Sequence, residues 1–176
     1  MKASTANRSS LSWYEASARQ RIDALVDAGS FNEFIGPELR EMSPHLSIFD
    51  LPGQFDDGII IGCGCLRGRA VLVAAQEGRF MGGAFGEVHG AKLTGLLRAA
   101  RRLNQDVLIL FDTGGVRLQE ANAGELAIAE IMRAVVELRR AGASVVGLIG
   151  GRAGCFRGCV LSAGGCCRPF VSAQGR

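Results

Sequence analysis

The feature that most constrains this chain is a short apolar run that ends in a glycine-bearing loop. Residues 106–111 form a predicted strand with almost continuous apolar character, and Asp112-Thr113-Gly114-Gly115 follows it. Such a run is typical of a strand that is buried on both faces of a sheet. Helices are predicted on either side of it in the sequence, over residues 88–103 and 120–141. In the second of these, four apolar residues share one stripe: Ile128, Ile131, Val135 and Leu138.

Further strands and turns surround these elements. Residues 58–64 and 69–75 are β-rich runs on either side of a short turn at residues 66–68, and this pattern predicts a hairpin. Another strand is expected at residues 144–149. A Gly-rich turn follows it and leads into an expected helix near residues 155–164.

The pattern before the hairpin is weaker. Residues 1–11 are polar and are expected to be disordered. A helix is expected from about residue 12 to residue 28, with Gly29 ending it. The stretch from there to residue 55 contains several prolines and is expected to be irregular.

The order of these elements predicts an α/β architecture in which helices are layered on buried strands. The 176 residues suffice for one sizeable core and are too few for two complete enzyme domains. The pattern by itself fits both a doubly wound sheet and a crotonase-like spiral of strand–strand–helix units.

Composition argues against several classes of partner. The formal net charge of +3 gives no reason to expect nucleic acid, although a local basic patch is compatible with an acidic carrier protein. No stretch approaches the roughly 18 apolar residues of a membrane-spanning helix, and no apolar run follows Lys2 and Arg8 as in a secretory signal. A cytoplasmic location without membrane contact is therefore expected.

The six cysteines lack C-x-x-C spacing, and neither histidine is placed to complete a metal site. No metal is therefore expected. The cysteines are interpreted as reduced, small apolar residues.

Three glycine-bearing turns follow predicted strands and precede predicted helices. They contain Gly82 and Gly83, Gly114 and Gly115, and residues 151–154. A helix N-terminus presents unpaired backbone N–H groups and favours negative charge, and glycine lets a ligand approach the backbone closely. Two such turns side by side would form an oxyanion hole, whereas any single pair of glycines is explained as well by a tight turn.

Other motifs indicate no competing chemistry. The sequence has no complete G-x-G-x-x-G fingerprint, no P-loop and no G-x-S-x-G nucleophile motif. His89, near Glu87 at a helix start, is interpreted as a base or, preferably, as a solvated first-turn residue. Arg117 and Glu120 are three residues apart and fit either a local ion pair or an anchor for a ligand phosphate or carboxylate.

Two segments at these turns carry a specific pattern: residues 80–92 read FMGGAFGEVHGAK and residues 111–122 read FDTGGVRLQEAN. With weaker matches at residues 18–31 and 56–58, they resemble the carboxyltransferase branch of the crotonase superfamily. Within that branch they are most similar to the β subunit of biotin-independent malonate decarboxylase, because the wider branch usually has a Ser-Gly-Gly-Ala-Arg version of the second segment. The resemblance covers about residues 12–167.

The resemblance implies a crotonase-like (ClpP/crotonase) spiral of β-β-α units, with residues 12–176 forming a partial, C-terminally truncated acyl-CoA carboxyltransferase domain. It also implies a reaction. Malonate would be carried as a thioester on the CoA-like arm of an acyl carrier protein, and loss of its carboxylate would leave an enolate on the thioester oxygen. The implied partners are that carrier and a second crotonase-like γ subunit. Neither biotin nor any covalently bound cofactor is implied, and the chain has no Met-Lys-Met biotinylation motif.

Two sets of residues are predicted to form the site. The backbone that would hold the enolate oxygen belongs to Gly114, Gly115, Gly151, Ala153 and Gly154. The residues that would bind substrate are Gly82, Gly83, Arg117 and Arg152.

The chain departs from the family pattern in two places. Arg157-Gly158-Cys159 replaces a small-residue run, and Pro169 falls in an expected apolar strand, where it removes a ladder donor. The chain also stops at Arg176 where family members continue, so it is expected to be inactive alone. Two alternatives stay open: a carboxyltransferase subunit of a biotin-dependent acyl-CoA carboxylase, and a non-catalytic remnant that binds a partner subunit or carrier.

Overall fold

A single mixed sheet organises the chain, whose computed structural model describes residues 12–155 and 165–173. The six strands lie in sequence order, β1-β2-β3-β4-β5-β6. Pairing is antiparallel from β1 to β3 and parallel from β3 to β6. In order, the strands are Asn32–Glu33, Ile59–Leu66, Arg69–Gln76, Val107–Phe111, Val145–Ile149 and Arg168–Val171.

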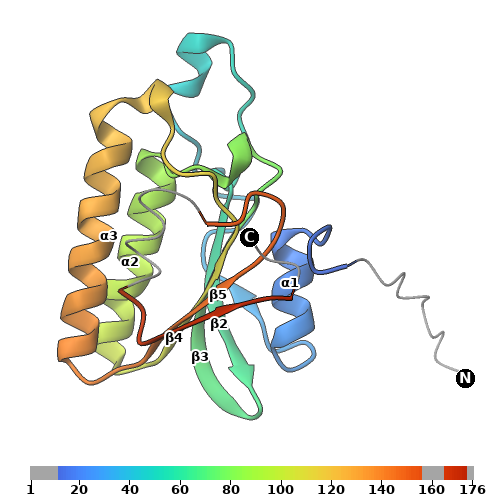
Figure 1. Ribbon diagram of the computed structural model, residues 1–176, viewed down its shortest axis with the longest axis vertical. Coiled ribbons are helices and arrows are strands. Elements are labelled where there is room, and N and C mark those ends of the chain that lie inside the picture. The colour runs from blue at the N-terminus through green and yellow to red at the C-terminus, as the bar shows by residue number, and fades with distance from the viewer. Residues whose placement is uncertain (1–11, 156–164, 174–176) are drawn as a thin grey trace, which may run out of the picture.

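Different helices cover the two faces of this sheet. The helices α2 (Glu87–Leu103) and α3 (Asn122–Arg140) lie side by side on one face, and α1 (Ala18–Leu25) lies on the other (Figure 1). Each parallel step in the sheet needs a crossover connection, and α2 and α3 provide two of them. Their N-termini therefore stand beside the carboxyl ends of the strands, which is the end of the sheet where the glycine turns lie.

The side chains of β4 divide between the two faces with the alternation of a strand. Val107, Ile109 and Phe111 pack with α2 and α3, whereas Leu108 and Leu110 pack with α1. Every residue of β4 is buried. The prediction of a strand covered on both faces, and of an α/β architecture, is confirmed.

The predicted hairpin is formed by β2 and β3, with Leu66 paired to Arg69. The two residues between them, Arg67 and Gly68, have φ angles of 52° and 75°. Positive φ at both positions is the geometry of a tight hairpin turn that matches strand twist. The carboxylate of Asp27 accepts both turn N–H groups, at 3.0 and 2.7 Å, and so ties the hairpin to the end of α1.

The first helix is shorter than predicted. It begins late because Ser17 and Gln20 form a capping box, each accepting a backbone N–H of the other. It ends early because Val26 is extended and buries its side chain against the sheet, so Gly29 does not end the helix. The segment predicted to be irregular contains β1 and the 3-10 helix η1 (Leu46–Phe49).

The other predicted elements in the described ranges agree with the structure to within two residues at each end. The strand β6 forms despite Pro169. It is the last strand in the sheet order, and its Pro169 pairs with Gly147 of β5. Proline is tolerated at such an edge position. The helix expected near residues 155–164, the Arg157-Gly158-Cys159 departure and the N-terminal disorder fall on residues 156–164 and 1–11, outside those described. Among the described helices, none combines the length and apolar character that crossing a membrane requires.

Gly90 and Gly95, both within α2, test how tightly the helices pack. A Cβ at Gly90 would lie 2.3 Å from the Cβ of Ala127 on α3, whereas a Cβ at Gly95 would have no atom within 4 Å. We expect Gly90→Ala to lower the free energy of unfolding by about 1–3 kcal/mol through overpacking. We expect Gly95→Ala to raise it by about 0.5–1 kcal/mol through helix propensity. Urea denaturation measures both, and an equal gain at the two positions would contradict the close approach at Gly90.

Candidate functional site

The three predicted glycine turns meet at the carboxyl ends of β3, β4 and β5. The N–H of Gly114 donates to the carbonyl oxygen of Gly82, and the N–H of Thr113 donates to that of Gly154, each at 2.8 Å. A Cβ at Gly83 would lie 1.8 Å from the carbonyl oxygen of Asp112, so the first turn reaches the second only because residue 83 is glycine. The structure thus places the predicted backbone site residues together.

Several N–H groups of these turns already have acceptors inside the chain. Besides the contact of Gly114 with the first turn, the N–H of Gly115 donates to Thr113 Oγ1 at 3.1 Å. The N–H of Ala153 donates to Asp112 Oδ1 at 2.8 Å. An N–H group has one hydrogen to donate. The oxyanion-binding role predicted for Gly114, Gly115 and Ala153 therefore conflicts with their hydrogen bonds.

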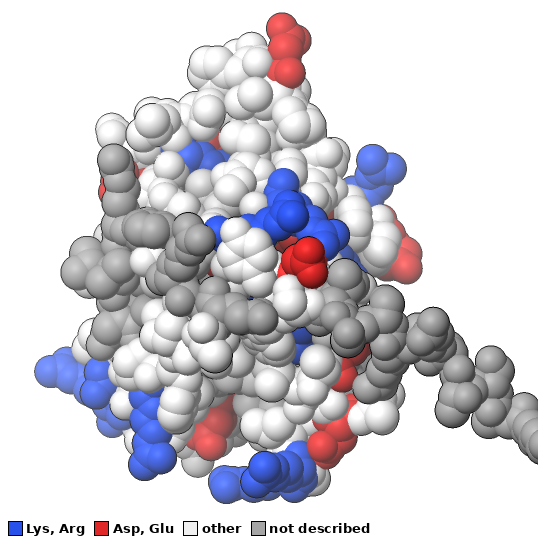
Figure 2. Space-filling view, turned by 45° about the vertical axis from the view of Figure 1, so that its right-hand side comes forward, with Lys and Arg blue, Asp and Glu red and all other residues white. Residues whose placement is uncertain are grey.

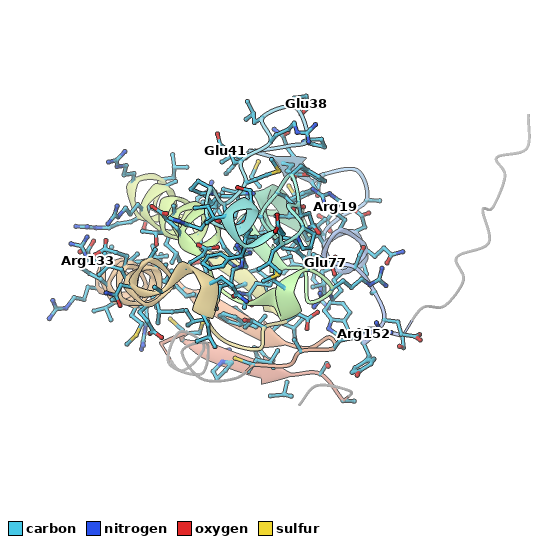
Figure 3. All side chains as sticks on the ribbon, turned by 90° about the horizontal axis from the view of Figure 1, so that it is seen from above. Arg19, Glu38, Glu41, Glu77, Arg133 and Arg152 are labelled. Carbon is cyan, nitrogen blue, oxygen red and sulfur yellow. The ribbon has the colours of Figure 1, made fainter. Side chains whose placement is uncertain are left out.

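The third turn retains N–H groups that have no acceptor within residues 12–155 and 165–173. Among the described residues, the backbone N–H groups of Gly151, Arg152 and Gly154 donate no hydrogen bond. Gly151 and Gly154 have φ angles of 94° and 71°, which favour glycine. Successive N–H groups in turns of this kind can form an anion-binding concavity. The side chain of Arg152 is exposed and lies on the same side of the molecule as Glu77, far from Arg133 on α3 (Figure 3).

A buried arginine ties the three strand ends together from the α1 side of the sheet. Arg21 is fully buried in α1. Its guanidinium donates to the carbonyl oxygen of Gln76 at 2.9 Å, to Asp112 Oδ2 at 2.8 Å and to the carbonyl oxygen of Gly150 at 3.3 Å. These three acceptors stand at the ends of β3, β4 and β5. One side chain therefore fixes the relative positions of the strands that carry the glycine turns.

Asp112 connects this arginine to the third turn. Its Oδ2 pairs with Arg21, and its Oδ1 accepts the N–H of Ala153. Burial raises the pKa of Asp112 and outweighs the opposing effect of Arg21. A Cβ at Gly151 would lie 2.2 Å from Asp112 Oδ2, so the turn can sit on the carboxylate only with glycine there.

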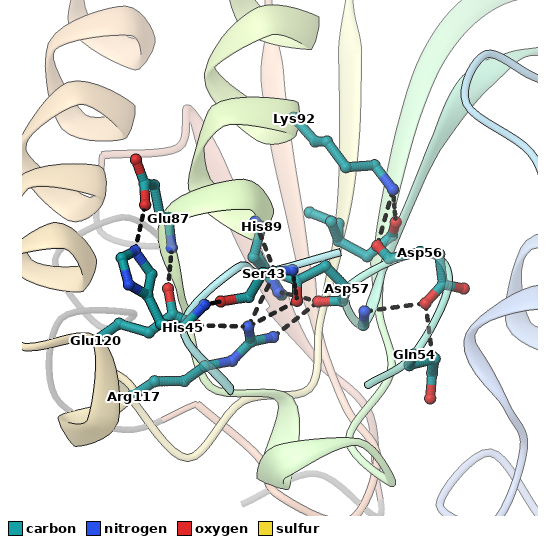
Figure 4. Close-up of polar contacts among 12 residues, drawn as sticks. Ser43, His45, Gln54, Asp56, Asp57, Glu87, His89, Lys92, Arg117 and Glu120 are labelled. Carbon is teal, nitrogen blue, oxygen red and sulfur yellow. Dashed lines mark hydrogen bonds and ion pairs between the residues drawn. The ribbon is translucent and has the colours of Figure 1, made fainter. Parts of the chain in front are cut away.

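A second buried arginine, Arg117, holds the α2 side of the site (Figure 4). Its Nη1 donates to both carboxylate oxygens of Asp57, at 2.8 and 2.9 Å, and its Nη2 donates to the Asp57 carbonyl oxygen at 2.8 Å. Nη1 also pairs with Glu120 Oε1 at 3.0 Å, and the guanidinium lies over the ring of Phe80. Arg117 and Glu120 were expected to form either a local ion pair or an anchor for a ligand, and the structure contains the ion pair. The predicted role of Arg117 in binding substrate stays a prediction, for a side chain that is buried and whose Nη groups are bonded to Asp57 and Glu120.

Glu120 couples this cluster to the start of α2. Its Oε2 accepts the N–H of Glu87, the first residue of the helix, at 2.6 Å. Burial raises the pKa of Glu120, but the bonds from Glu87 and Arg117 bring it below its ordinary value. A Cβ at Gly86 would lie 2.5 Å from Glu120 Oε1 and 2.6 Å from Arg117 Nη1, so glycine at the helix N-cap leaves room for this ion pair.

His89 is buried and uncharged, which corrects its interpretation as a solvated first-turn residue. Gln76 Oε1 accepts the N–H of Asp112 at 3.2 Å, so Gln76 Nε2 is the donor to His89 Nε2 at 3.1 Å. The proton of the ring then lies on Nδ1, which donates to the Asp57 carbonyl oxygen at 3.3 Å (Figure 4). Burial, reinforced by Arg117, holds the pKa of His89 well below its ordinary value. A buried ring bonded in this way is also unsuited to act as a base, which was the alternative interpretation.

Four residues that organise the site were not predicted: Arg21, Asp57, Gln76 and Asp112. For Arg21 a signal was present, because it shares a helical face with the buried Ala18 and Ile22, where a charge needs a partner. Asp57 and Asp112 lay within the segments that carry the family resemblance. Their roles depend on residues distant in sequence, and no local spacing indicates them.

Within the described ranges, no group of histidine, cysteine or acidic side chains is arranged to hold a metal ion. Cys63, Cys65 and Cys167 are free thiols, and burial raises the pKa of the Cys166 thiol to about 12. Cys155 is disulfide-bonded, which corrects the expectation that every cysteine is reduced.

Known proteins resemble the chain over most of its length. Residues 15–157 match the model of the carboxyl transferase domain family. Malonyl-S-ACP:biotin-protein carboxyltransferase MADC of Malonomonas rubra is 41% identical over 162 residues, which are 84% of this chain and 51% of that protein. The propionyl-CoA carboxylase beta chain of Saccharopolyspora erythraea is 35% identical over 116 residues, 66% of this chain and 21% of that protein.

Among solved structures, a chain of a Pseudomonas malonate decarboxylase hetero-tetramer in complex with malonate superposes with a TM-score of 0.90 and 45% identity. The match covers 94% of this chain and 62% of that chain. This likeness confirms the predicted crotonase-like fold over the doubly wound alternative. The chain spans about half the length of the Malonomonas protein.

The buried Arg117 and the surface Arg133 form a matched pair for testing the cluster. We expect Arg117→Met to lower the free energy of unfolding by about 3–5 kcal/mol, because Asp57 and Glu120 stay buried without their cation. Arg133 also pairs with a glutamate, Glu130, at 2.7 Å, but its side chain is 57% exposed. We therefore expect Arg133→Met to leave the urea midpoint unchanged. Equal effects of the two substitutions would show that the buried cluster has no special structural role.

Burial of His89 makes stability depend on pH. In the unfolded chain this imidazole takes up a proton below about pH 6.5, whereas in the folded chain its lowered pKa keeps it neutral. The unfolded state then binds more protons, so stability is lost as the pH falls. We expect the free energy of unfolding to fall by about 1 kcal/mol from this source between pH 6.5 and 5.5. Urea denaturation at both pH values should show that His89→Gln removes this fall and that His45→Gln keeps it.

Proposed function

The chain belongs to the carboxyl transferase domain family, and on that basis we propose that it is the β-type subunit of a biotin-independent malonate decarboxylase. The substrate is a malonyl thioester on the CoA-like arm of an acyl carrier protein, and the products are the acetyl thioester and CO₂. Two likenesses support this assignment: the Malonomonas relative is named for malonyl-S-ACP, and the Pseudomonas neighbour is a malonate decarboxylase with malonate bound.

In this reaction the bond between the α-carbon and the carboxylate breaks. CO₂ leaves, and the electron pair stays on the thioester as an enolate, with its negative charge on the thioester oxygen. A proton then adds to the α-carbon. Donors that are held in place before the reaction stabilise such a charge without reorganisation, and losing one typically costs about 100- to 1000-fold in rate.

The observation that carries the proposal is the third turn, where N–H groups that no described residue accepts stand beside the hydrogen bonds of Asp112 and Arg21. Asp112 holds that turn by accepting the N–H of Ala153, and Arg21 holds it by donating to the carbonyl oxygen of Gly150. We therefore assign the oxyanion donors to Gly151, Arg152 and Gly154. Gly114 and Gly115 are assigned to packing the second turn against the first, because their own N–H groups are already bonded.

The proton that completes the reaction comes, in this proposal, from a second crotonase-like subunit. The buried acids among the described residues are engaged by arginines: Asp56 by Arg19, Asp57 and Glu120 by Arg117, and Asp112 by Arg21. His89 is neutral and sealed from solvent. A partner is supported by the Pseudomonas structures, which are a hetero-tetramer and a hetero-dimer.

A second candidate is carboxyl transfer to biotin, with the same enolate logic and a different carboxyl acceptor. The Malonomonas relative favours it, because that protein is named a biotin-protein carboxyltransferase. The propionyl-CoA carboxylase likeness points the same way. Formation of carboxybiotin from the malonyl thioester, in place of free CO₂, would distinguish this activity.

Arg152 offers a matched pair of variants that separates backbone from side chain. The protein is co-expressed with a γ-type malonate decarboxylase subunit and assayed for acetyl thioester formed from malonyl-loaded carrier protein. We expect Arg152→Ala, which keeps the N–H, to raise KM and leave kcat nearly unchanged. We expect Arg152→Pro, which removes the N–H, to lower kcat by about 100- to 1000-fold.

Partner binding and the thermal midpoint of each variant serve as controls for folding. Unchanged turnover in a folded Arg152→Pro complex would contradict the oxyanion assignment. A wild-type complex that binds carrier and partner without turnover would instead favour the non-catalytic alternative.

A further inference from the structure

The first glycine turn contains a large side chain in a backbone conformation that favours glycine. Three successive residues form the 3-10 helix η2 (Met81–Gly83), and their φ angles are 49°, 63° and 67°. Glycine adopts a positive φ at no steric cost, whereas a residue with a Cβ is strained there. Such a residue persists where its surroundings impose the conformation, and strained residues of this kind cluster at ligand-binding sites. Met81 is therefore a candidate for a role in the site.

The neighbours of Met81 impose this conformation. The N–H of Gly83 donates to the carbonyl oxygen of Phe80 at 2.8 Å, which closes the turn around Met81. The Phe80 ring is buried, and the guanidinium of Arg117 lies over it at 5.2 Å from its centroid. The Met81 side chain itself is partly exposed. The turn is thus anchored from below while this side chain stays accessible to a ligand.

The surface between the first and second turns is bare backbone. Gly82 and Gly114 are both exposed, and the N–H of Gly114 donates to the carbonyl oxygen of Gly82. Among the described residues beyond its chain neighbours, a Cβ at Gly82 would have no atom within 4 Å. A Cβ at Gly114 would meet that carbonyl oxygen alone, at 3.5 Å. Both glycines therefore border open space, where a ligand can lie directly on the backbone.

Met81 is the single large apolar side chain in the three turns, which comprise residues 81–83, 112–115 and 150–154. Most of these residues are glycine. The others besides Met81 are small or polar: Asp112, Thr113, Arg152 and Ala153. An acyl group that lies on the turns therefore meets one large apolar side chain from them.

Met81 also lies within reach of a group held at the third turn. The first and third turns follow β3 and β5, which stand on either side of β4. Two strand spacings are about 10 Å, and an extended methionine side chain reaches roughly 5 Å from the backbone. The remaining distance is close to one carbon–carbon contact of ~4 Å. The side chain can thus touch the carbon next to a thioester whose oxygen is held by the third turn.

We propose that Met81 determines specificity for the acyl group, by packing against the α-carbon of the bound thioester and excluding a substituent there. This inference rests on the proposed function for the reaction. A malonyl group has no α-substituent and fits, whereas the methyl group of a 2-methylmalonyl thioester overlaps Met81. Lys and Arg side chains stand out on the surface in Figure 2, but they cannot make this distinction, because the two thioesters carry the same charge.

The test compares two pairs of thioesters in the complex co-expressed with a γ-type malonate decarboxylase subunit. Decarboxylation of malonyl- and 2-methylmalonyl-loaded carrier protein gives a ratio of kcat/KM. Calorimetry with acetyl- and propionyl-pantetheine, which have no carboxylate to lose, gives a ratio of Kd that needs no turnover. One carbon in an apolar pocket is discriminated by about 10- to 200-fold. We therefore expect the wild type to prefer the unsubstituted member of each pair by at least about 10-fold.

Substitutions at Met81 separate the side chain from the backbone strain. We expect Met81→Ala to reduce both preferences to less than about threefold, and Met81→Leu, of similar volume, to keep them. Met81→Gly should lose the preferences and also raise the urea midpoint, because glycine is unstrained at this φ.

Arg67→Gly is the matched control. Arg67 also has a positive φ, 52°, but it lies in the β2–β3 turn, at the opposite end of β3 from the glycine turns. We expect this variant to raise the urea midpoint and to keep both preferences.

The remaining outcomes separate this inference from the proposed function. Equal acceptance of both members by the wild type, binding of neither, or equal loss in Arg67→Gly overturns the role of Met81. Decarboxylation of malonyl with an unchanged preference in Met81→Ala leaves the proposed function standing while the specificity role fails. A Kd preference for acetyl over propionyl that Met81→Ala removes, without decarboxylation by the wild type, supports the specificity role while the proposed function fails.

Discussion

The ion pair between Arg117 and Asp57 is the interaction on which the rest of the structure depends. The Asp57 carboxylate also accepts the N–H groups of Ser43 and His89, at 3.2 and 2.9 Å. One buried carboxylate therefore joins the η1 segment, the first turn of α2 and the loop after β4. Such a pair adds little net stability, because desolvation offsets the attraction, but its loss leaves a buried charge unpaired. The ion pair and the other bonds of Asp57 therefore favour one arrangement of η1, α2 and the loop after β4.

Arg21 and Asp112 repeat this principle from the α1 side of the sheet. Both buried arginines donate to a carboxylate and to backbone carbonyl oxygens, which the planar guanidinium fork can do and a lysine ammonium cannot reproduce. Arg21 fixes the ends of β3, β4 and β5 from the α1 side, and Arg117 joins the loop after β4 to Asp57 on the α2 side. The close approach of backbone and carboxylates explains why residues 83, 86 and 151 are glycine.

The chemistry proposed for the site depends on which polar groups of the glycine turns are already hydrogen-bonded within the chain. The N–H groups of Thr113, Gly114, Gly115 and Ala153 all donate hydrogen bonds within the chain. Two of these bonds, from Thr113 to Gly154 and from Ala153 to Asp112, hold the third turn in place. Among the described residues, the buried histidine is neutral and the buried acids are paired with arginines.

The sequence by itself determined the strands β2 to β5, the helices α2 and α3 and the place of the glycine turns. Apolar periodicity and cap residues act over a few positions, so residues 106–111 and the stripe of α3 were sufficient evidence for their elements. The quoted motifs also carried the family. Only the tertiary structure decided the state of each polar group. Gly114 bonds to Gly82 and Arg21 to Asp112 across long separations in sequence. His89 and Arg117 are buried by elements that their neighbours in the chain do not reveal. A hydrogen bond or a buried charge is defined by its partner, and local sequence does not name that partner.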